Sequence, residues 1–248
     1  MKKVQIGQTL KNNFGSTIIL TKYENCNNID VYFPDYNWTA FNARYKDFKK
    51  GSIRCPYEPR IYNVAYLGEG IYKAYENNKA TKCYSVWKSM LERCYNSKYK
   101  ENKPTYKECK VCDEWLNYQN FAKWFEGNYY TIKNEKIALD KDILVKNNKI
   151  YSPDTCIFVP VRINSLFLRR QNCRGELPIG VHYVDSTKKY EVQCANNNLG
   201  AYDTSEEAFS VYKQYKENMI KQVADKYKEC IPRKLYNAMY EYEVEIDD

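Results

Sequence analysis

The stretch that decides the fold is residues 137–170, IALDKDILVKNNKIYSPDTCIFVPVRINSLFLRR. A strand-like run ends in LDKD at 139–142, and Asn147 and Asn148 then favour a turn. A second apolar run at 156–159 leads into a basic tail with helical character. The sequence therefore predicts a small finger made of two strands and one helix.

Two amphipathic helices are predicted before this finger, because apolar residues recur there at helical spacing. These residues are Trp87, Met90, Leu91 and Cys94 in the first helix and Cys112, Trp115, Phe121, Trp124 and Phe125 in the second. Large apolar side chains at this spacing form a buried helix face. We therefore expect both faces to pack in the core that holds the finger, within a domain at 83–172.

The chain before these helices is rich in strand-forming residues. Runs at 17–23 and 29–33 are separated by an asparagine-rich turn, and glycine and proline punctuate a later loop at 51–59. Residues 76–82, ENNKATK, are interpreted as a linker. We therefore expect a β-rich module at 1–78, which resembles the SH3-like modules at the front of phage endonuclease-like proteins.

The last part of the chain, 173–248, predicts a three-stranded antiparallel sheet, a helix and an acidic tail. The strand-like runs are 179–184, 190–194 and 199–202. Thr204 or Ser205 then caps the helix, and Glu206 and Glu207 follow in its first turn, where the helix dipole favours acids. The whole chain is therefore expected to have an α+β fold.

The net charge indicates a polyanionic partner. The chain has 39 Lys and Arg against 31 Asp and Glu, a net charge of +8. Five of the acids lie in the last eight residues, EYEVEIDD, so residues 1–240 carry +13. The 26 tyrosines add stacking faces and hydroxyl groups, which suit nucleic-acid or protein surfaces.

The ten cysteines are interpreted as free thiols. The sequence has no N-terminal apolar segment typical of secretion and no apolar run of about 18 residues. We therefore expect a cytoplasmic protein with reduced thiols and no membrane partner. A structural zinc site is the alternative: Cys109 and Cys112 have ligand spacing, and Cys83, Cys94 or Cys156 would complete the site.

Several segments in and before the finger form a series of motifs. WKSMLERCYN contains Trp-x-x-Met-x-x-Arg-Cys, VCDEWLNYQNFAKWF contains Val-Cys-x-x-Trp, and the finger has a Leu-Asp-basic strand and a Tyr-x-Pro strand. This series resembles the HNH-type homing endonucleases of bacteriophages. The resemblance implies that Asp140 is a metal ligand, that Lys141 occupies the general-base position and that Asn164 is the ligand on the helix. Thr155 stands where that family has an asparagine that supports the loop between the strands.

The finger lacks the histidine that this chemistry needs. In the family, a histidine takes a proton from water, and Asp with Asn or His holds a divalent metal that stabilises the phosphate. Lys141 needs a lowered pKa to act as the base, and the neighbouring Asp140 and Asp142 raise it. We therefore predict a degenerate finger that does not cleave DNA and needs no cofactor.

Two alternatives to this prediction stay open for the finger. In the first, the protein is an active metal-dependent endonuclease with Mg²⁺ or Mn²⁺ at Asp140 and Asn164. In the second, Asp140 pairs with Lys141 or Lys149 and merely closes the strand.

The C-terminal segment LPIGVHYVDSTKKYEVQCANNNLGAYDTSEEAFSVYKQYKENMI carries a second motif series. It has Gly-Val, a short turn, a basic-aromatic strand, Leu-Gly-x-aromatic-Asp-Thr and a helix that begins Glu-Glu-Ala. It is similar to AP2 domains, which implies that the helix covers one sheet face and that the other face lies in the DNA major groove. Alternation places Tyr190, Val192 and Cys194 toward the helix and Lys189, Glu191 and Gln193 outward.

The similarity to AP2 domains also assigns contacts with double-stranded DNA. His182 occupies the base-reading position of the first strand, where the family has arginine. The DNA-contacting residues that we expect are Arg162, Arg169, Arg170, Arg174, His182, Lys188, Lys189 and Gln193. Because the family's other arginines on this face are largely absent, phosphate contacts are expected to dominate over base readout.

Together these patterns predict a DNA-binding protein of a phage or mobile element that acts in the bacterial cytoplasm. One alternative is a working homing endonuclease. The other is an anti-defence effector that uses the same basic surface to bind a host defence protein. Salt separates them, because phosphate contacts weaken steeply with salt, whereas a protein interface depends on buried anchor residues.

Overall fold

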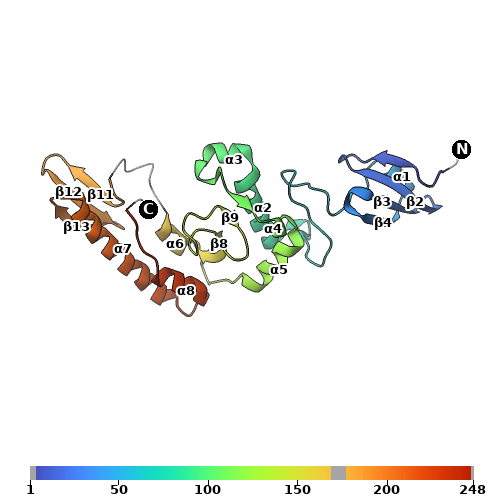
Figure 1. Cartoon of the computed structure of the whole chain (residues 1–248). Helices are drawn as coiled ribbons and strands as arrows, with labels where there is room; N and C mark the ends of the chain where they lie inside the picture. The colour runs from blue at the N-terminus through green and yellow to red at the C-terminus, as the bar shows by residue number, and fades with distance from the viewer. Residues whose placement is uncertain (1–3, 169–176, 247–248) are drawn as a thin grey trace. The chain divides into compact units, whose positions relative to one another are not determined.

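The computed structural model of the chain describes residues 4–168 and 177–246 (Figure 1). Helices and strands are mixed along the chain, which confirms the α+β prediction. The chain divides into two compact units. Unit 1 comprises residues 1–127 with 149–152, and unit 2 comprises residues 128–148 with 153–248.

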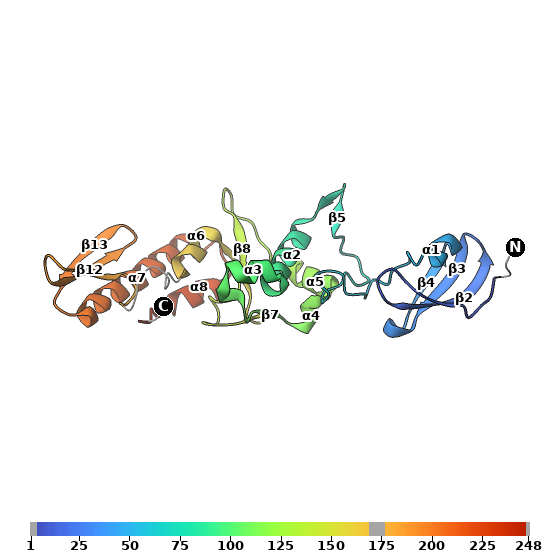
Figure 2. The same ribbon diagram turned by 90° about the horizontal axis from the view of Figure 1, so that it is seen from above.

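Unit 1 begins with an antiparallel sheet in the order β1-β2-β3-β4 (Figure 2). The strands are β1 (Thr9–Lys11), β2 (Thr17–Asn25), β3 (Asn28–Phe33) and β4 (Trp38–Ala43), with the short helices η1 (Pro34–Tyr36) and α1 (Tyr45–Lys49). Both predicted strand runs are present. Alternate side chains of β2 and β3 point inward and form a core with Phe48 of α1; they are Ile18, Leu20, Ile29, Val31 and Phe33.

A buried carboxylate fixes the loop after α1. Glu58 is 2% exposed, and its Oε1 accepts a hydrogen bond from Nδ2 of Asn12 at 2.6 Å. Its Oε2 accepts from the amide of Cys55 at 3.2 Å and lies 3.5 Å from Nε of Arg54. The buried carboxylate of Glu58 therefore has acceptor contacts inside the unit, and these fix the conformation of the loop.

Residues 76–82, which the sequence analysis interprets as a linker, include a hairpin instead. Strands β5 (Tyr75–Glu76) and β6 (Lys79–Ala80) pair across Asn77 and Asn78, whose φ angles are 49° and 60°. Two consecutive residues with positive φ form the tight turn that matches strand twist. Asparagine adopts this left-handed conformation at low cost, so the two asparagines form a hairpin turn. The segment is therefore an ordered hairpin.

The helical part of unit 1 confirms most of the predicted faces. Its elements are α2 (Lys82–Tyr95), α3 (Ser97–Asn102), η2 (Pro104–Tyr106), α4 (Asp113–Leu116), α5 (Tyr118–Asn128) and the parallel pair β7 (Lys110–Val111) and β9 (Ile150–Tyr151). Thr81 caps α2 by accepting from the amide of Tyr84. The predicted face of α2 is buried, and Nε1 of Trp87 donates to the carbonyl of Trp115 at 2.7 Å. Cys112, Trp124 and Phe125 are half-buried.

Unit 2 contains the predicted strand–strand–helix order of the finger. Strands β8 (Ile137–Asp140) and β10 (Ile157–Pro160) are antiparallel, and α6 (Val161–Asn164) and η3 (Ser165–Phe167) follow. Asp140 pairs with Ile157, and Ile137 pairs with Pro160. The helix thus starts at the end of the hairpin opposite Asp140.

The second part of unit 2 is a three-stranded sheet with two helices. The elements are β11 (Val181–Val184), β12 (Lys189–Cys194), β13 (Asn197–Tyr202), α7 (Ser205–Tyr227) and α8 (Arg233–Tyr240), and the sheet order is β11-β12-β13. Of the two predicted caps, Thr204 is the N-cap of α7, and its side chain accepts from the amide of Glu207 at 3.2 Å. Thr204 therefore supplies the stabilising cap that the sequence predicts.

Helix α7 runs from the sheet of β11, β12 and β13 toward α8 (Figure 1), and it takes part in two cores. Its first half packs Ala208 and Tyr212 against Val181 and Val192 of the sheet. Its second half packs against α8 and the finger, in a cluster that comprises Ile143, Ile157, Val159, Ile163, Ile220, Ala224, Ile231, Leu235 and Met239. At 23 residues α7 is about 34 Å long, enough to serve both cores.

The acidic C-terminal segment is folded back onto unit 2. Val244 is 3% exposed in the sheet core, and its amide donates to Glu217 at 2.9 Å. Nζ of Lys213 donates to the carbonyl of Val244, and Nζ of Lys146 lies 3.4 Å from Glu245. Up to residue 246, the predicted acidic tail is therefore a docked segment whose apolar residue anchors it.

Candidate nucleic-acid interface

Asp140 closes the turn that follows β8. Its Oδ1 accepts hydrogen bonds from the backbone amides of Asp142 at 2.7 Å and Ile143 at 2.8 Å. Burial raises the pKa of this carboxyl group, and the two hydrogen bonds act in the opposite direction. The side chain predicted as a metal ligand therefore accepts hydrogen bonds from the backbone of its own turn.

Lys141 is enclosed in the same turn and is 6% exposed. Its ammonium group donates to the two carboxylate oxygens of Asp142 at 2.7 and 2.8 Å and to the carbonyl of Asn148 at 2.6 Å. An ammonium group has three protons to donate, and three acceptor oxygens lie within hydrogen-bond distance of this one. The residue predicted at the general-base position is therefore a clamp between the two sides of the loop.

Asn148 completes this clamp, and the sequence analysis missed its role. Its Nδ2 donates to the carbonyl of Lys141 at 2.8 Å, while its own carbonyl accepts from Lys141. Asn148 and Lys141 thus hold the two sides of the loop together. The Asn147–Asn148 pair, which marks the turn, was the available signal, and Asn147 has the positive φ of 60°.

Lys141 and Lys149, the two predicted partners of Asp140, each have another carboxylate close by. The ion pair of Lys141 is with Asp142, and Nζ of Lys149 lies 4.0 Å from Glu108. Oδ1 of Asp140 turns toward two backbone amides, because these amides would otherwise lack an acceptor in a buried turn.

The finger is a poor fit to a divalent metal. Mg²⁺ and Mn²⁺ prefer several oxygen ligands, and one oxygen of Asp140 already accepts two hydrogen bonds beside the charge of Lys141. Asn164 lies half-buried at the end of α6, the helix that starts at the end of the hairpin opposite Asp140. Over residues 4–168 and 177–246, no group of three or more His, Cys, Asp or Glu side chains could hold a metal ion.

The cysteines that the structure describes are free thiols, including the predicted zinc candidates. Cys94, Cys109 and Cys156 are buried, and Cys83 and Cys112 are half-buried. They belong to the apolar interior, where cysteine behaves as a small hydrophobic residue.

The sheet of unit 2 has the alternation that the sequence predicts. Val192 and Cys194 are buried toward α7 at 0% and 4% exposure, and Tyr190 is half-buried beside them. On the other face Gln193 is exposed, and Glu191 and Lys189 are half-buried. The outward face therefore carries polar side chains that a ligand can reach.

His182 and the two predicted phosphate-binding lysines lie at the surface of this sheet. Nε2 of His182 lies 3.4 Å from its cross-strand neighbour Glu191. Lys189 pairs with Asp203 at 3.1 Å, and Lys188 lies 3.8 Å from Asp185. Exposed pairs such as these contribute about 0–1 kcal/mol, so a phosphate group can displace the acids.

The other predicted DNA contacts are arginines. Arg162 is exposed on α6. Arg169, Arg170 and Arg174 lie outside the described residues.

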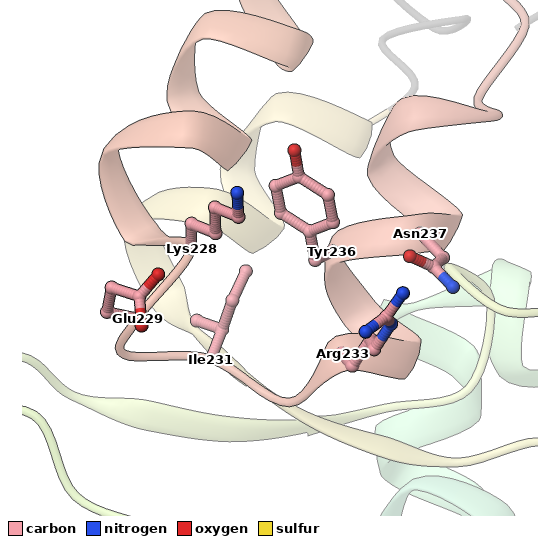
Figure 3. Close-up of a pocket in the computed structure, with 6 residues that line it drawn as sticks. All are labelled: Lys228, Glu229, Ile231, Arg233, Tyr236 and Asn237. Atoms are coloured by element: carbon pink, nitrogen blue, oxygen red, sulfur yellow. The ribbon is translucent and has the colours of Figure 1, made fainter.

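An open pocket of about 350 Å³, which the sequence analysis missed, lies where α7 turns into α8 (Figure 3). Its lining residues are Lys228, Glu229, Ile231, Arg233, Tyr236 and Asn237. Nζ of Lys228 lies 6.0 Å from the centre of the Tyr236 ring. The pocket carries two cations against one acid, so it adds to the positive surface of unit 2.

In the part of the chain that the structure describes, no helix is both long and apolar enough to cross a membrane. Comparisons with protein-family models, with curated proteins and with solved structures find nothing that matches this chain.

Proposed function

We propose that this protein binds double-stranded DNA without cleaving it, on a scaffold that resembles a degenerate phage HNH homing endonuclease joined to an AP2-like sheet. The contacts of Lys141 carry the proposal. At the position of the family's general base stands an enclosed ammonium group that is held by Asp142 and Asn148. A protonated lysine in such contacts has no free electron pair with which to take a proton from water.

Charge and surface chemistry support the DNA-binding part of the proposal. Residues 1–240 carry +13. The sheet exposes His182 and Gln193, half-buried Lys189 lies on the same face as Gln193, and Lys188 is exposed in the turn before β12. The lysines supply phosphate contacts, and the amide and imidazole supply hydrogen bonds to base edges. The protein is therefore expected to hold DNA mainly through its backbone.

The test is duplex binding measured by fluorescence anisotropy over a range of salt concentrations. The affinity of the full chain should fall steeply between low and physiological salt, because phosphate contacts release counterions. The double variant Lys188→Ala with Lys189→Ala should weaken binding for all sequences alike and should lower the salt slope by about two.

The matched control is Lys49→Ala with Lys50→Ala, which removes two adjacent exposed lysines from unit 1. It makes the same change in net charge, and it should alter the affinity much less than the variant of the sheet. Absence of binding, or binding that ignores salt, would contradict the proposal. The alternative of an effector that binds a host protein would then be favoured, and a pulldown from bacterial lysate with and without nuclease would test it.

The second part of the proposal predicts that the protein does not cut DNA. Supercoiled plasmid incubated with the protein and Mg²⁺ or Mn²⁺ should be nicked no faster than with Asp140→Ala, since Lys141 provides no base. Nicking is measured by the conversion of supercoiled to open circular plasmid on a gel. Fast metal-dependent nicking that Asp140→Ala abolishes would identify the protein as an active endonuclease.

A further inference from the structure

Arg93, in the last turn of α2, has an unusual environment for an arginine. The side chain is half-buried, and its Nη1 donates to the hydroxyl of Tyr151 at 3.4 Å. The ionisable groups that act on it most strongly, apart from burial itself, are the phenols of Tyr151, Tyr106 and Tyr99. The guanidinium thus contacts Tyr151 of β9, and Tyr106 of η2 and Tyr99 of α3 lie near enough to act on its charge.

No carboxylate in the described part of unit 1 pairs with Arg93. Other arginines of the unit differ: Arg44 lies 2.8 Å from Asp47, and Arg54 lies 3.5 Å from Glu58. Phenols are neutral at pH 7, so they offer dipoles but no negative charge. Burial lowers the pKa of Arg93 and the neighbouring phenols raise it, with a net rise, so the guanidinium stays charged in a half-buried site. A bound anion would supply the counter-charge that neutral phenols lack.

The surroundings favour a phosphate group as that anion. The segment 97–110, SKYKENKPTYKECK, has five lysines and two glutamates. The rings of Tyr99 and Tyr106 meet edge to face, with centroids 5.7 Å apart, and both side chains are half-buried. A guanidinium offers a planar fork of donors that matches phosphate oxygens, and phenol hydroxyls can donate beside it.

We propose that Arg93, with Tyr99 and Tyr106, forms a phosphate-binding site in unit 1 that takes a backbone phosphate of nucleic acid. This inference rests on the proposed DNA binding and adds a contact point outside the sheet of unit 2. It gives the arginine of the Trp-x-x-Met-x-x-Arg-Cys segment a task in binding, while its apolar neighbours Trp87, Met90 and Cys94 fill the core.

The first test compares duplex binding by the full-length Arg93→Gln and Arg93→Lys variants at one fixed low salt concentration. Arg93→Gln should bind about tenfold or more weakly and should lower the salt slope by about one, because one charged phosphate contact is lost. Arg93→Lys keeps the charge without the fork, so it should retain the slope and lose less affinity. Arg44→Gln is the matched control, since Arg44 is an arginine of the same unit that already pairs with an acid; it should stay within about twofold of the unsubstituted protein.

Chemical modification of the unsubstituted protein covers the case in which Arg93→Gln fails to fold. Duplex DNA should slow the reaction of Arg93 with phenylglyoxal, as followed by mass spectrometry, and should leave Arg44 unprotected. Binding by a folded Arg93→Gln variant at the unsubstituted affinity, or equal reactivity of Arg93 with and without DNA, would overturn the site as a nucleic-acid contact.

Inorganic phosphate distinguishes this inference from the DNA-binding proposal. At matched ionic strength, phosphate in place of chloride should raise the melting temperature of the unsubstituted protein and of Arg44→Gln, but not of Arg93→Gln. If phosphate has this effect and DNA is not bound, the site takes free phosphate and the nucleic-acid source is wrong. If DNA is bound and neither phosphate nor Arg93→Gln has an effect, the site is wrong and the proposed function stands.

Discussion

Two neighbouring residues, Asp140 and Lys141, both stabilise the turn in which they stand. Here Asp140 accepts from two backbone amides, and Lys141 bridges Asp142 and the carbonyl of Asn148. Both side chains thus satisfy polar groups inside one turn, where an unmet hydrogen bond costs about 1–3 kcal/mol.

The buried position of Asp140 leads to a pH-dependent prediction. Because burial raises its pKa, the folded protein holds the proton more tightly than the unfolded chain does. Ionised Asp140 therefore destabilises the fold. This effect is absent below the pKa of Asp in the unfolded chain, about 3.9, and it is complete once the pH exceeds the raised pKa of the folded state. Asp140→Asn keeps an oxygen acceptor and removes the charge. As the pH rises through this window, the unsubstituted protein should therefore lose stability relative to Asp140→Asn, as measured by the free energy of unfolding.

Urea unfolding of the two proteins at a series of pH values measures this difference. Asp140→Ala is the control, since it removes both the charge and the acceptor, and it should be about 1 kcal/mol less stable than Asp140→Asn at every pH. A difference between Asp140→Asn and the unsubstituted protein that stays constant with pH would contradict the assignment.

At the scale of elements, the spacing of apolar residues and the helix-capping residues predicted the features that depend on local sequence. The buried face of α2, the outward and inward residues of β12 and the cap at Thr204 are all present. The enclosure of Lys141 and the docking of Val244 could not be predicted this way, because each depends on contacts between segments far apart in the chain or on the geometry of one turn. The motif therefore singled out Asp140 and Lys141, but the contacts of these side chains required the structure.

Helix α7 is the element whose full role the sequence did not reveal. Its first half carries the side chains predicted to cover the sheet, and its second half belongs to the core of the finger. Ile220→Ala should therefore cost about 2–5 kcal/mol, as large-to-small changes in cores do, and should loosen the sheet as well as the finger. Native-state hydrogen exchange should show lower protection of the amides of Val181 and Val192, which lie in the sheet that packs against the other half of α7.

Ile18→Ala, in the separate core of β2 and β3, is the control for this experiment. It should destabilise its own sheet and leave the protection of Val181 and Val192 unchanged. If Ile220→Ala lowers protection only in β8 and β10, the two cores of unit 2 open independently and α7 does not couple them.

At the scale of the whole molecule, charge is distributed unevenly along the chain. Residues 1–240 carry +13, and the acidic segment after them folds back, with Lys146 beside Glu245 and Lys213 bonded to the carbonyl of Val244. The acids from 241 to 245 thus belong to the surface of unit 2 and reduce its positive field locally. Arg162, Lys188, Lys189 and Arg93 stand apart from this segment in sequence, on the finger, in the sheet region and on α2.

The path of the chain between the two units decides how the protein can be dissected. The chain leaves unit 1 after residue 127, returns to it for residues 149–152 and leaves it again. No single cut therefore yields both units whole: a piece that starts at 128 takes β9 away from β7, and a piece that ends at 172 leaves the finger without Ile220 and Ala224 of α7. Truncated pieces would expose apolar surface and report on their own misfolding, so the parts of this protein have to be compared by point substitutions in the intact chain.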